Sequence, residues 1–409
     1  MLRLIFLFLL INLLSISNAQ GLIIKSLRCY SSADETAFPI ISNNEEQQSI
    51  TIDFDIQTSQ YPNLAIHFRF CDADWRPYDN VFLLNPIYNT ENNIYLERLP
   101  LNIKGAQYHY KGTFPNQNVT FPFSGKWKYF IVDQFDRRKI YAEGKFFVVN
   151  PEIRINTKLF RETLQNRFDE SSVMNRTVAL QTSFILPDSL FHVYVKRVEI
   201  FINRKMEYPI IIEKFANTSD HFFEWNASNR FSFLARNIYP MNEYRSTDTR
   251  DYNVYNNTLV HAKFGEIETS DFFSKRRRDY NGGTFLLSHR NENAEYLDVQ
   301  FRIRPPEDIT KPIFLVGSFT NWKVLPEFEM FDDNGLLNLT VELKRGYHEY
   351  QYVTGDLRNG RIENIDWNIL EGNFYETQNE YHIFLYYEEQ DKGIYDKIIG
   401  YSKITGGAL

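Results

Sequence analysis

Apolar and polar residues alternate along several short segments of the chain. The clearest segments are residues 50–56, 126–131, 299–304 and 337–344. Because successive side chains of a β-strand point to opposite faces of a sheet, each segment can bury one face and expose the other. Pro, Gly and Asn residues separate the segments, as the turns of a β-sandwich require. The pattern therefore predicts an all-β protein.

The first twenty residues follow a different pattern, which is typical of an export signal. Arg3 supplies a positive charge, residues 4–14 form an apolar run interrupted by Asn12, and small residues at 17 and 19 frame a cleavage site. The apolar run is shorter than the ~20 residues that a membrane-spanning helix needs. We therefore expect residues 1–19 to be a signal peptide cleaved after Ala19, with no direct membrane insertion of the mature protein.

Chain breakers suggest where the domains end. A chain of 409 residues exceeds one hydrophobic core and, at ~100–200 residues a domain, suggests two to four domains. Asn150-Pro151 blocks continuation of the strand before it, because proline lacks a backbone N–H, and residues 280–283 form a turn pattern. We expect three consecutive β-sandwiches that form one elongated body, at residues 20–150, 151–282 and 283–409.

Composition limits the classes of partner. Aromatic residues make up 16% of the chain, which favours strands. The net charge is −7, with acidic and basic residues intermixed, which argues against nucleic acid as a partner. Cys29 and Cys71 leave two interpretations open, a disulfide in an exported protein or two buried thiols.

The sequence lacks the motifs of catalytic and cofactor sites. The eight histidines are scattered singly, so no HxH or HExxH ligand pair occurs. There is also no nucleophile elbow, P-loop or GxGxxG run. We expect a protein that is not an enzyme and that binds no cofactor or metal.

One local feature indicates a contact with a partner. Four adjacent basic residues follow two phenylalanines, and the run comprises Phe272, Phe273, Lys275, Arg276, Arg277 and Arg278. Basic residues can pair with carboxylates of a partner, and aromatic residues can anchor the contact. The alternative is a solvated loop. We predict that this run binds a partner protein.

The C-terminal third carries a first resemblance. Gly317, Phe319 and Trp322 form a Gly-x-Phe-x-x-Trp motif, and Tyr347 and Tyr350 begin a later strand. This segment resembles glycogen-binding, early-set immunoglobulin-like domains. The resemblance implies a sandwich of that type and a possible glycan site.

In that glycan site, Trp322 and Trp367 would stack on sugar rings. The alternative is that both tryptophans are packed inside the sandwich.

A second resemblance extends over most of the chain. Six segments resemble, in the same order, the plug proteins of the type IX secretion system: residues 70–75, 114–116, 124–127, 242–245, 371–377 and 395–401. The resemblance implies a periplasmic protein, held at the outer membrane through its partner, that binds the large translocon barrel and closes its periplasmic opening when idle. With it we expect all three domains to be immunoglobulin-like sandwiches. The alternative function is an exported carbohydrate-binding protein.

Overall fold

The protein is all-β, as the alternation predicted. The computed structural model describes residues 21–31, 34–42, 49–164, 173–226, 228–286 and 294–407, so the expected signal peptide lies outside the described residues. Within these ranges the strands form six sheets. The helices there are four 3-10 turns: η1 (Val81–Leu83), η2 (His192–Tyr194), η3 (Ser318–Thr320) and η4 (Pro326–Phe328).

The first sandwich packs two sheets around one apolar core. One sheet has the order β1 (Ile23–Ser31), β3 (Ile50–Gln57), β7 (Tyr108–Phe114), β6 (Glu97–Arg98); the other has the order β2 (Ile40–Ser42), β9 (Ile140–Val149), β8 (Gly125–Asp133), β4 (Leu64–Cys71), β5 (Thr90–Glu91). The alternating segment predicted at 50–56 is β3. Its apolar residues Ile50, Ile52, Phe54 and Ile56 are fully buried against Trp127 and the other core residues.

The second sandwich is built from two separate parts of the chain. One sheet has the order β10 (Ile155–Thr163), β11 (Arg176–Ile185), β15 (Arg230–Ile238), β14 (His221–Trp225); the other has the order β13 (Ile210–Glu213), β12 (Val195–Ile202), β26 (Glu380–Glu389), β27 (Tyr395–Thr405). β26 pairs antiparallel with β12 from Val195 to Ile202. The last strands of the chain therefore complete the sandwich that residues 155–238 begin.

The third sandwich is inserted between these two parts. One sheet has the order β16 (Arg245–Asp248), β24 (Tyr347–Arg358), β19 (Thr284–Phe285), with β21 (Ile313–Gly317) and β25 (Arg361–Asp366) also on β24; the other has the order β17 (Leu259–His261), β20 (Tyr296–Arg304), β23 (Leu336–Lys344), β22 (Phe331–Asp333), with β18 (Glu268–Thr269) on β20. The predicted segments 299–304 and 337–344 lie in β20 and β23.

The sheets do not follow the expectation of three consecutive domains. The boundary expected near 150 falls between β9 and β10, but no sheet boundary lies at residue 282, because β16 to β18 already belong to the third sandwich. The expected C-terminal domain, 283–409, is also divided, since β26 and β27 pair with β12. A strand pattern shows that a segment forms a strand and leaves its partner unspecified.

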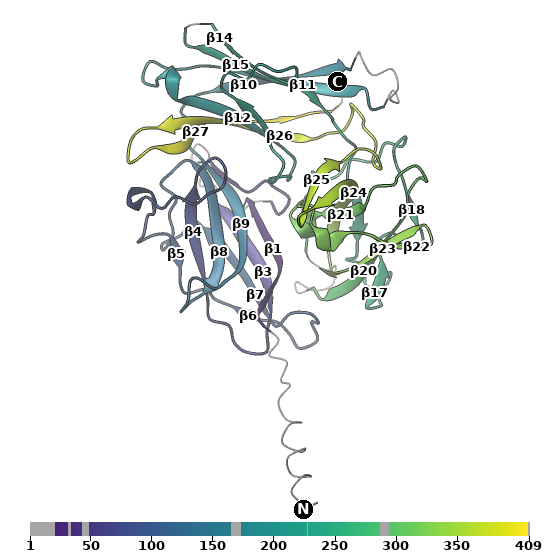
Figure 1. Cartoon of the computed structure of the whole chain (residues 1–409). Helices are drawn as coiled ribbons and strands as arrows, with labels where there is room; N and C mark the ends of the chain where they lie inside the picture. The colour runs from purple at the N-terminus through teal and green to yellow at the C-terminus, as the bar shows by residue number, and fades with distance from the viewer. Residues whose placement is uncertain are drawn as a thin grey trace, which may run out of the picture.

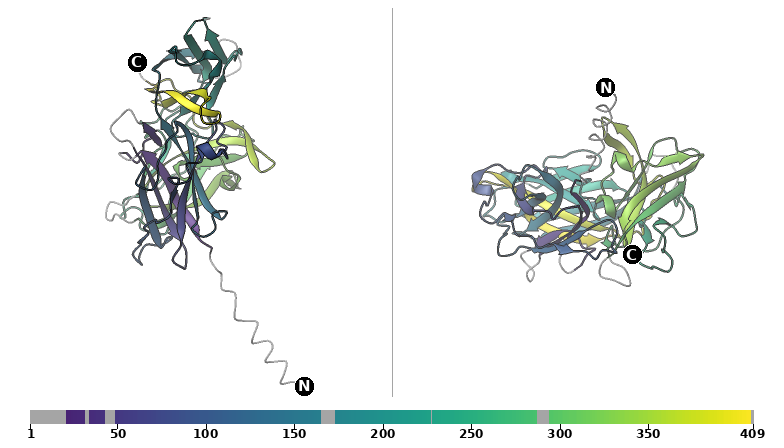
Figure 2. Two further views of the ribbon diagram at one scale, coloured as in Figure 1. Left: turned by 90° about the vertical axis from the view of Figure 1, so that its left-hand side faces the viewer. Right: turned by 90° about the horizontal axis from the view of Figure 1, so that it is seen from below.

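The three sandwiches form a cluster, which corrects the expectation of an elongated row. In Figures 1 and 2 the second sandwich lies across the ends of the other two, which stand side by side. The first and third sandwiches are in direct contact: Lys344 on β23 lies 2.8 Å from Asp55 on β3. In an elongated row, the first and third sandwiches would not touch each other.

Each pair of sandwiches meets at an apolar cluster. Between the first and second sandwiches the cluster includes Phe147 and Phe384, whose ring centroids are 4.4 Å apart. The second and third sandwiches meet at Tyr208, Trp322 and neighbouring residues. A smaller cluster joins Leu99, Ile103 and Ala106 to Tyr296 of the third sandwich. All three sandwiches therefore form one packed body.

Candidate functional site

Five of the six segments that carry the second resemblance lie at the joints between sandwiches, and segment 114–116 lies within the first sandwich. At the first joint, Lys126 on β8 forms an ion pair of 2.7 Å with Glu199 on β12, and both side chains are buried. Arg197 of the same strand donates a hydrogen bond of 2.7 Å to the carbonyl of Ala73. The backbone N–H of Ala73 donates to the Asp396 carboxylate at 2.9 Å. Segments 70–75, 124–127 and 395–401 thus hold the first and second sandwiches together.

Segments 242–245 and 371–377 form the joint where the chain enters and leaves the third sandwich. The Arg245 guanidinium binds both carboxylate oxygens of Glu371, at 3.0 and 3.1 Å, and also Glu268 at 3.0 Å. Asn242 donates 2.7 Å to the carbonyl of Glu371, and the Met241 N–H donates 2.9 Å to Asn373. The two chain segments are therefore hydrogen-bonded to each other and, through Glu268, to the third sandwich.

The structure separates the members of the predicted basic run. Arg276 is mostly buried and structural, because it binds Asp271 at 2.7 Å, Glu371 and the carbonyl of Glu243. This corrects the prediction that all four basic residues face a partner.

The rest of the run remains accessible. Lys275, Arg277 and Arg278 are exposed, and so is Phe273. Phe272 is half-buried, with its ring 4.9 Å from the ring of Phe273. One exposed aromatic ring and three exposed cations therefore stay available to a partner.

The two tryptophans proposed to stack on sugars are both packed. Trp322 is 1% exposed, donates 2.9 Å to the carbonyl of Gly282 and lies 4.0 Å from the ring of Tyr244. It cannot present a face to a glycan, which corrects that prediction. Trp367 is half-buried, and the Lys205 ammonium covers its ring at 3.8 Å. The alternative of packed tryptophans therefore fits both residues.

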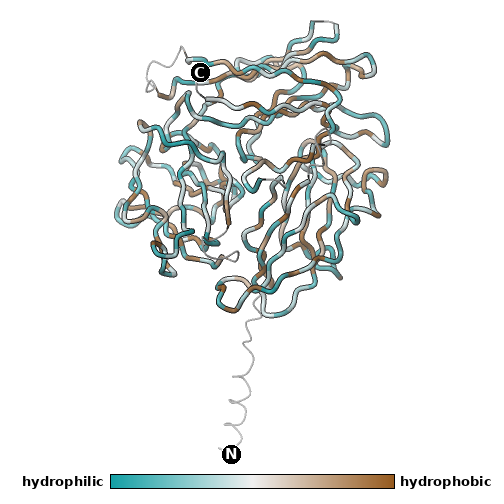
Figure 3. Tube along the Cα trace, turned by 180° about the vertical axis from the view of Figure 1, so that it is seen from behind, coloured by the Kyte–Doolittle hydropathy of each residue, from teal (hydrophilic) through white to brown (hydrophobic). Residues whose placement is uncertain are grey.

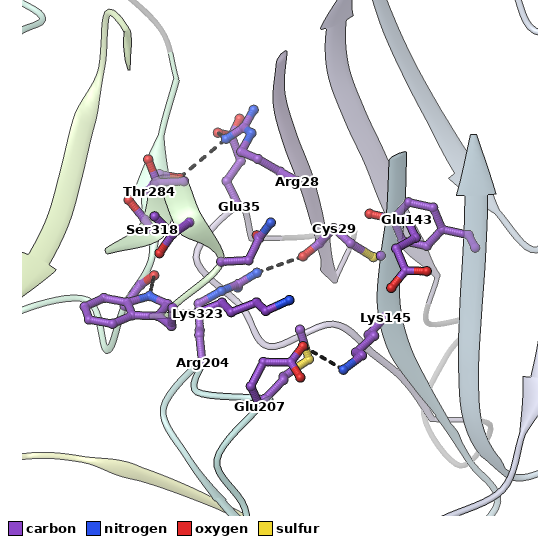
Figure 4. Close-up of a pocket in the computed structure, with 17 residues that line it drawn as sticks. Arg28, Cys29, Glu35, Glu143, Lys145, Arg204, Glu207, Thr284, Ser318 and Lys323 are labelled. Atoms are coloured by element: carbon purple, nitrogen blue, oxygen red, sulfur yellow. Dashed lines mark hydrogen bonds and ion pairs between the residues drawn. The ribbon is translucent and has the colours of Figure 1, made fainter. Parts of the chain in front are cut away.

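A cavity of about 170 Å³ lies where the three sandwiches meet (Figure 4). Arg204 of the second sandwich reaches into the first, where it donates 2.7 Å to the carbonyl of Cys29. Lys145 pairs with Glu207 at 2.6 Å across the same boundary. The polar groups shown in Figure 4 thus bond one sandwich to another, which is the arrangement of a structural junction.

The two cysteines are free and buried, so the structure supports the buried-thiol interpretation. Burial raises the pKa of each thiol to about 12, so both stay protonated at neutral pH. Among the described residues, no group of three or more His, Cys, Asp or Glu is placed to hold a metal ion. None of the helices in those same ranges has the length and apolar character needed to cross a membrane.

Sequence reasoning missed one exposed surface, at the end of the first sandwich that points away from the second. We call it the first-sandwich tip, and it comprises Tyr61, Tyr95, Leu101, Phe135, Arg137, Arg138, Lys139 and Ile140, all of them exposed. Figure 3 shows hydrophobic stretches in the loops at this end. A signal was present in the sequence, because the hairpin between β8 and β9 repeats the pattern of a phenylalanine followed by basic residues.

Comparisons with known proteins identify the first sandwich. Residues 24–150 match the family described as type 9 secretion system plug protein 1st domain. No curated protein matches the chain. A solved structure of a hypothetical protein from Parabacteroides merdae shares the fold, with a TM-score of 0.74 and 19% identity over 93% of this chain and 97% of that chain.

A chain of a 1.5-MDa bacterial ice-binding adhesin aligns over 95% of this chain and 98% of that chain, at 8% identity and a TM-score of 0.15. The match to residues 24–150 is therefore the finding that relates this protein to a family: its first sandwich is a first domain of the type 9 secretion system plug family.

Proposed function

We propose that this protein is a non-catalytic periplasmic plug that binds the large outer-membrane translocon barrel of the type 9 secretion system and closes its periplasmic opening when idle. The observation that carries the proposal is the match of residues 24–150 to the plug-protein first domain. The protein acts by covering an opening, so no cofactor or reacting group takes part.

The joints between the sandwiches support this function, because a plug has to keep its shape over a wide opening. Each joint contains an ion pair with little exposure: Lys126 with Glu199, Arg245 with Glu371, and Lys344 with Asp55. Removing one partner of a buried pair costs ~3–5 kcal/mol, since the remaining charge is left buried alone. The three sandwiches therefore resist movement relative to one another.

The exposed part of the basic run is the contact that we propose for the barrel. Phe273 is 78% exposed and can enter an apolar depression on the partner. Lys275, Arg277 and Arg278 lie beside it on a chain of net charge −7, so they can pair with carboxylates of the barrel rim. Arg276 is left out, because its hydrogen bonds are already made inside the joint.

Two measurements test the plug function. The protein, tagged and isolated from the envelope of its own organism, should co-purify with a large outer-membrane barrel. A strain without the protein should admit large polar dyes that the parent strain excludes. Absence of the barrel from the purified material, with no change in permeability, would contradict the proposal. Binding to a glycan array in place of a barrel would favour the carbohydrate-binding alternative.

A triple substitution tests the contact. Changing Lys275, Arg277 and Arg278 to Ser should weaken recovery of the barrel, most strongly at low salt, while the melting temperature stays the same. Exposed substitutions alter stability by less than ~0.5 kcal/mol each. The matched control changes three exposed basic residues elsewhere on the third sandwich to Ser: Lys311, Arg358 and Arg361. Equal recovery of barrel by both triple variants would show that the run is only solvated.

A further inference from the structure

We infer that the first-sandwich tip is a second docking surface, which binds the translocon barrel through a patch of carboxylates around an apolar depression. The inference rests on the proposed function, because it takes the same barrel as partner. It concerns a different sandwich from the basic run, and it lies within the part of the chain that matches the plug family.

The tip is one surface because hydrogen bonds join the loops that form it. The Gln134 N–H donates 3.0 Å to the carbonyl of Asn63, and the Gln134 side chain donates 3.2 Å to the carbonyl of Asn92. The Thr58 N–H donates 2.8 Å to the side chain of Gln107. The loops after β3, before β6, before β7 and after β8 are therefore held side by side.

Three apolar side chains of the tip are almost fully exposed. Leu101 is 94% exposed, Tyr95 is 85% exposed and Phe135 is 83% exposed. Single exposed apolar residues are common on protein surfaces, but a group of large ones at one end of one domain marks an interaction site. Aromatic residues of this kind supply most of the binding energy of protein interfaces.

The hairpin that carries Phe135 is ordered before any partner binds. The Asp133 carboxylate accepts hydrogen bonds from the backbone N–H groups of Phe135, at 2.9 Å, and Asp136, at 3.2 Å. These bonds lower the pKa of Asp133, and the bond from the Phe135 N–H has the largest effect. The carboxylate therefore stays charged and keeps the turn closed. A preformed loop loses little conformational entropy on binding, which favours a tight contact.

The charges of the tip indicate the chemistry of the partner. Residues 136–139 contain three basic residues and one acidic residue, a net +2 on a chain of net −7. Asp136 forms an ion pair of 3.0 Å with Arg138. The other two basic residues, Arg137 and Lys139, are exposed as well. A partner with exposed carboxylates complements this surface.

Photo-crosslinking from the tip tests the inference in the living envelope. A photoreactive amino acid at Leu101 or Phe135 should form a crosslink to the translocon barrel, and one at Phe215, another exposed phenylalanine on the second sandwich, should not. Crosslinks from Leu101 and Phe135 to another protein, or to no protein, would overturn the inference.

A triple variant gives a second measurement. Tyr95→Ser, Leu101→Ser and Phe135→Ser together should lower the affinity for the purified barrel roughly tenfold or more, because three exposed apolar anchors are lost. The matched control carries Phe191→Ser, Val193→Ser and Phe215→Ser on the second sandwich. Both variants should keep the melting temperature of the wild type.

The possible results separate this inference from the proposed function. If the wild type binds the barrel and the tip variant binds it equally well, the inference is wrong and the plug function stands. If the wild type itself does not bind the barrel, the proposed function fails as well. If the tip variant instead loses sedimentation with vesicles of phosphatidylethanolamine and phosphatidylglycerol, the tip binds lipid and the inference is also wrong.

Discussion

Two carboxyl groups at the edge of the third sandwich, the buried Glu349 and the half-buried Asp279, make stability depend on pH. Asp279 accepts a hydrogen bond from the Tyr244 N–H, and Glu349 accepts bonds of 2.7 Å from the N–H groups of Tyr280 and Gly282. Burial first, and then the charge of neighbouring carboxylates, raises the pKa of Asp279 to about 7 and that of Glu349 to about 8. The folded protein therefore holds protons that the unfolded chain has released.

A substitution of Glu349 tests this pH dependence. A carboxyl pKa raised by folding stabilises the protein at low pH, and that stability is lost as pH rises from ~4 through the raised values. Glu349→Gln removes one of the two charges, so its melting temperature should fall less than that of the wild type between pH 5 and 7. Thermal unfolding followed by circular dichroism at several pH values measures the difference.

The comparison with wild type is needed because other buried groups act in the opposite direction. Burial lowers the pKa of His67 and of His348 to about 4, so their contribution to stability rises with pH up to ~6.5. The exposed Glu363→Gln, in the same sandwich, serves as the control. If Glu349→Gln and Glu363→Gln give the same pH profile, the carboxyl pair is not the source of the effect.

At the same scale, the sequence could not separate the members of the basic run. Lys275, Arg276, Arg277 and Arg278 are chemically alike and adjacent, so no local pattern shows which of them is buried. Arg276 is selected by Glu371, which lies 95 residues away in the sequence. The exposure of Lys275, Arg277 and Arg278 could be predicted, because charged side chains are almost never buried unless they are paired with an opposite charge.

The strands themselves were predictable, whereas their partners were not. Alternation identified β3, β20 and β23 because one face of each strand is buried. It also implied that the polar face of β3 is exposed, yet Asp53 and Asp55 are buried. Arg28 binds Asp53 at 2.7 Å and Lys344 binds Asp55 at 2.8 Å, so each carboxylate is buried with a cation. Pairing partners from distant segments are not encoded in a local period.

Segments 242–245 and 371–377 cross where the chain enters and leaves the third sandwich, and the ion pairs between these crossing segments support a prediction about stability. Arg245→Met should leave Glu268 without its cation and Glu371 with Arg276 alone, all inside the protein. The expected loss is about 3 kcal/mol of unfolding free energy, at the low end for a broken buried pair because some partners remain. Denaturant unfolding of the purified protein measures the change.

The control for this prediction is an arginine in the next loop. Arg250 pairs with Asp248 at 2.7 Å, and both side chains are partly exposed. Arg250→Met should therefore cost less than ~1 kcal/mol. Equal costs for Arg245→Met and Arg250→Met would mean that the crossing segments do not depend on the buried ion pair.

At the scale of the whole molecule, the order of the sandwiches along the chain did not reveal their arrangement in space. The second resemblance was right about the plug family, and the match to residues 24–150 confirms this for the first sandwich. Five of the six segments that carried the second resemblance proved to be joints, which explains why they did not resemble a binding site. A joint depends on specific residue types at a few positions, such as Lys126 and Arg245, so a motif in the sequence can reveal it. A contact surface follows no regular period in the sequence, so no such pattern reveals it.

The last prediction concerns the contact between the first and third sandwiches. Asp55 is fully buried there, where it binds Lys344 at 2.8 Å, the Tyr296 hydroxyl at 2.9 Å and His109 at 2.8 Å. Lys344→Glu would bring a second carboxylate against Asp55 in a site that excludes water. Because like charges at close range repel strongly in such a site, the two sandwiches should separate while each keeps its own core.

Small-angle X-ray scattering should then show a larger radius of gyration for Lys344→Glu, with unchanged β-sheet content by circular dichroism. Lys311→Glu makes the same change of charge at an exposed position of the same sandwich, where Lys311 lies 3.5 Å from Asp356, and should leave the radius of gyration as in the wild type. Under the proposed function a plug needs a fixed shape to cover an opening, so the separated variant should still bind the barrel but admit the dyes that the wild type is proposed to exclude. If Lys344→Glu stays compact, the apolar cluster around Tyr296 holds the two sandwiches together without the ion pair.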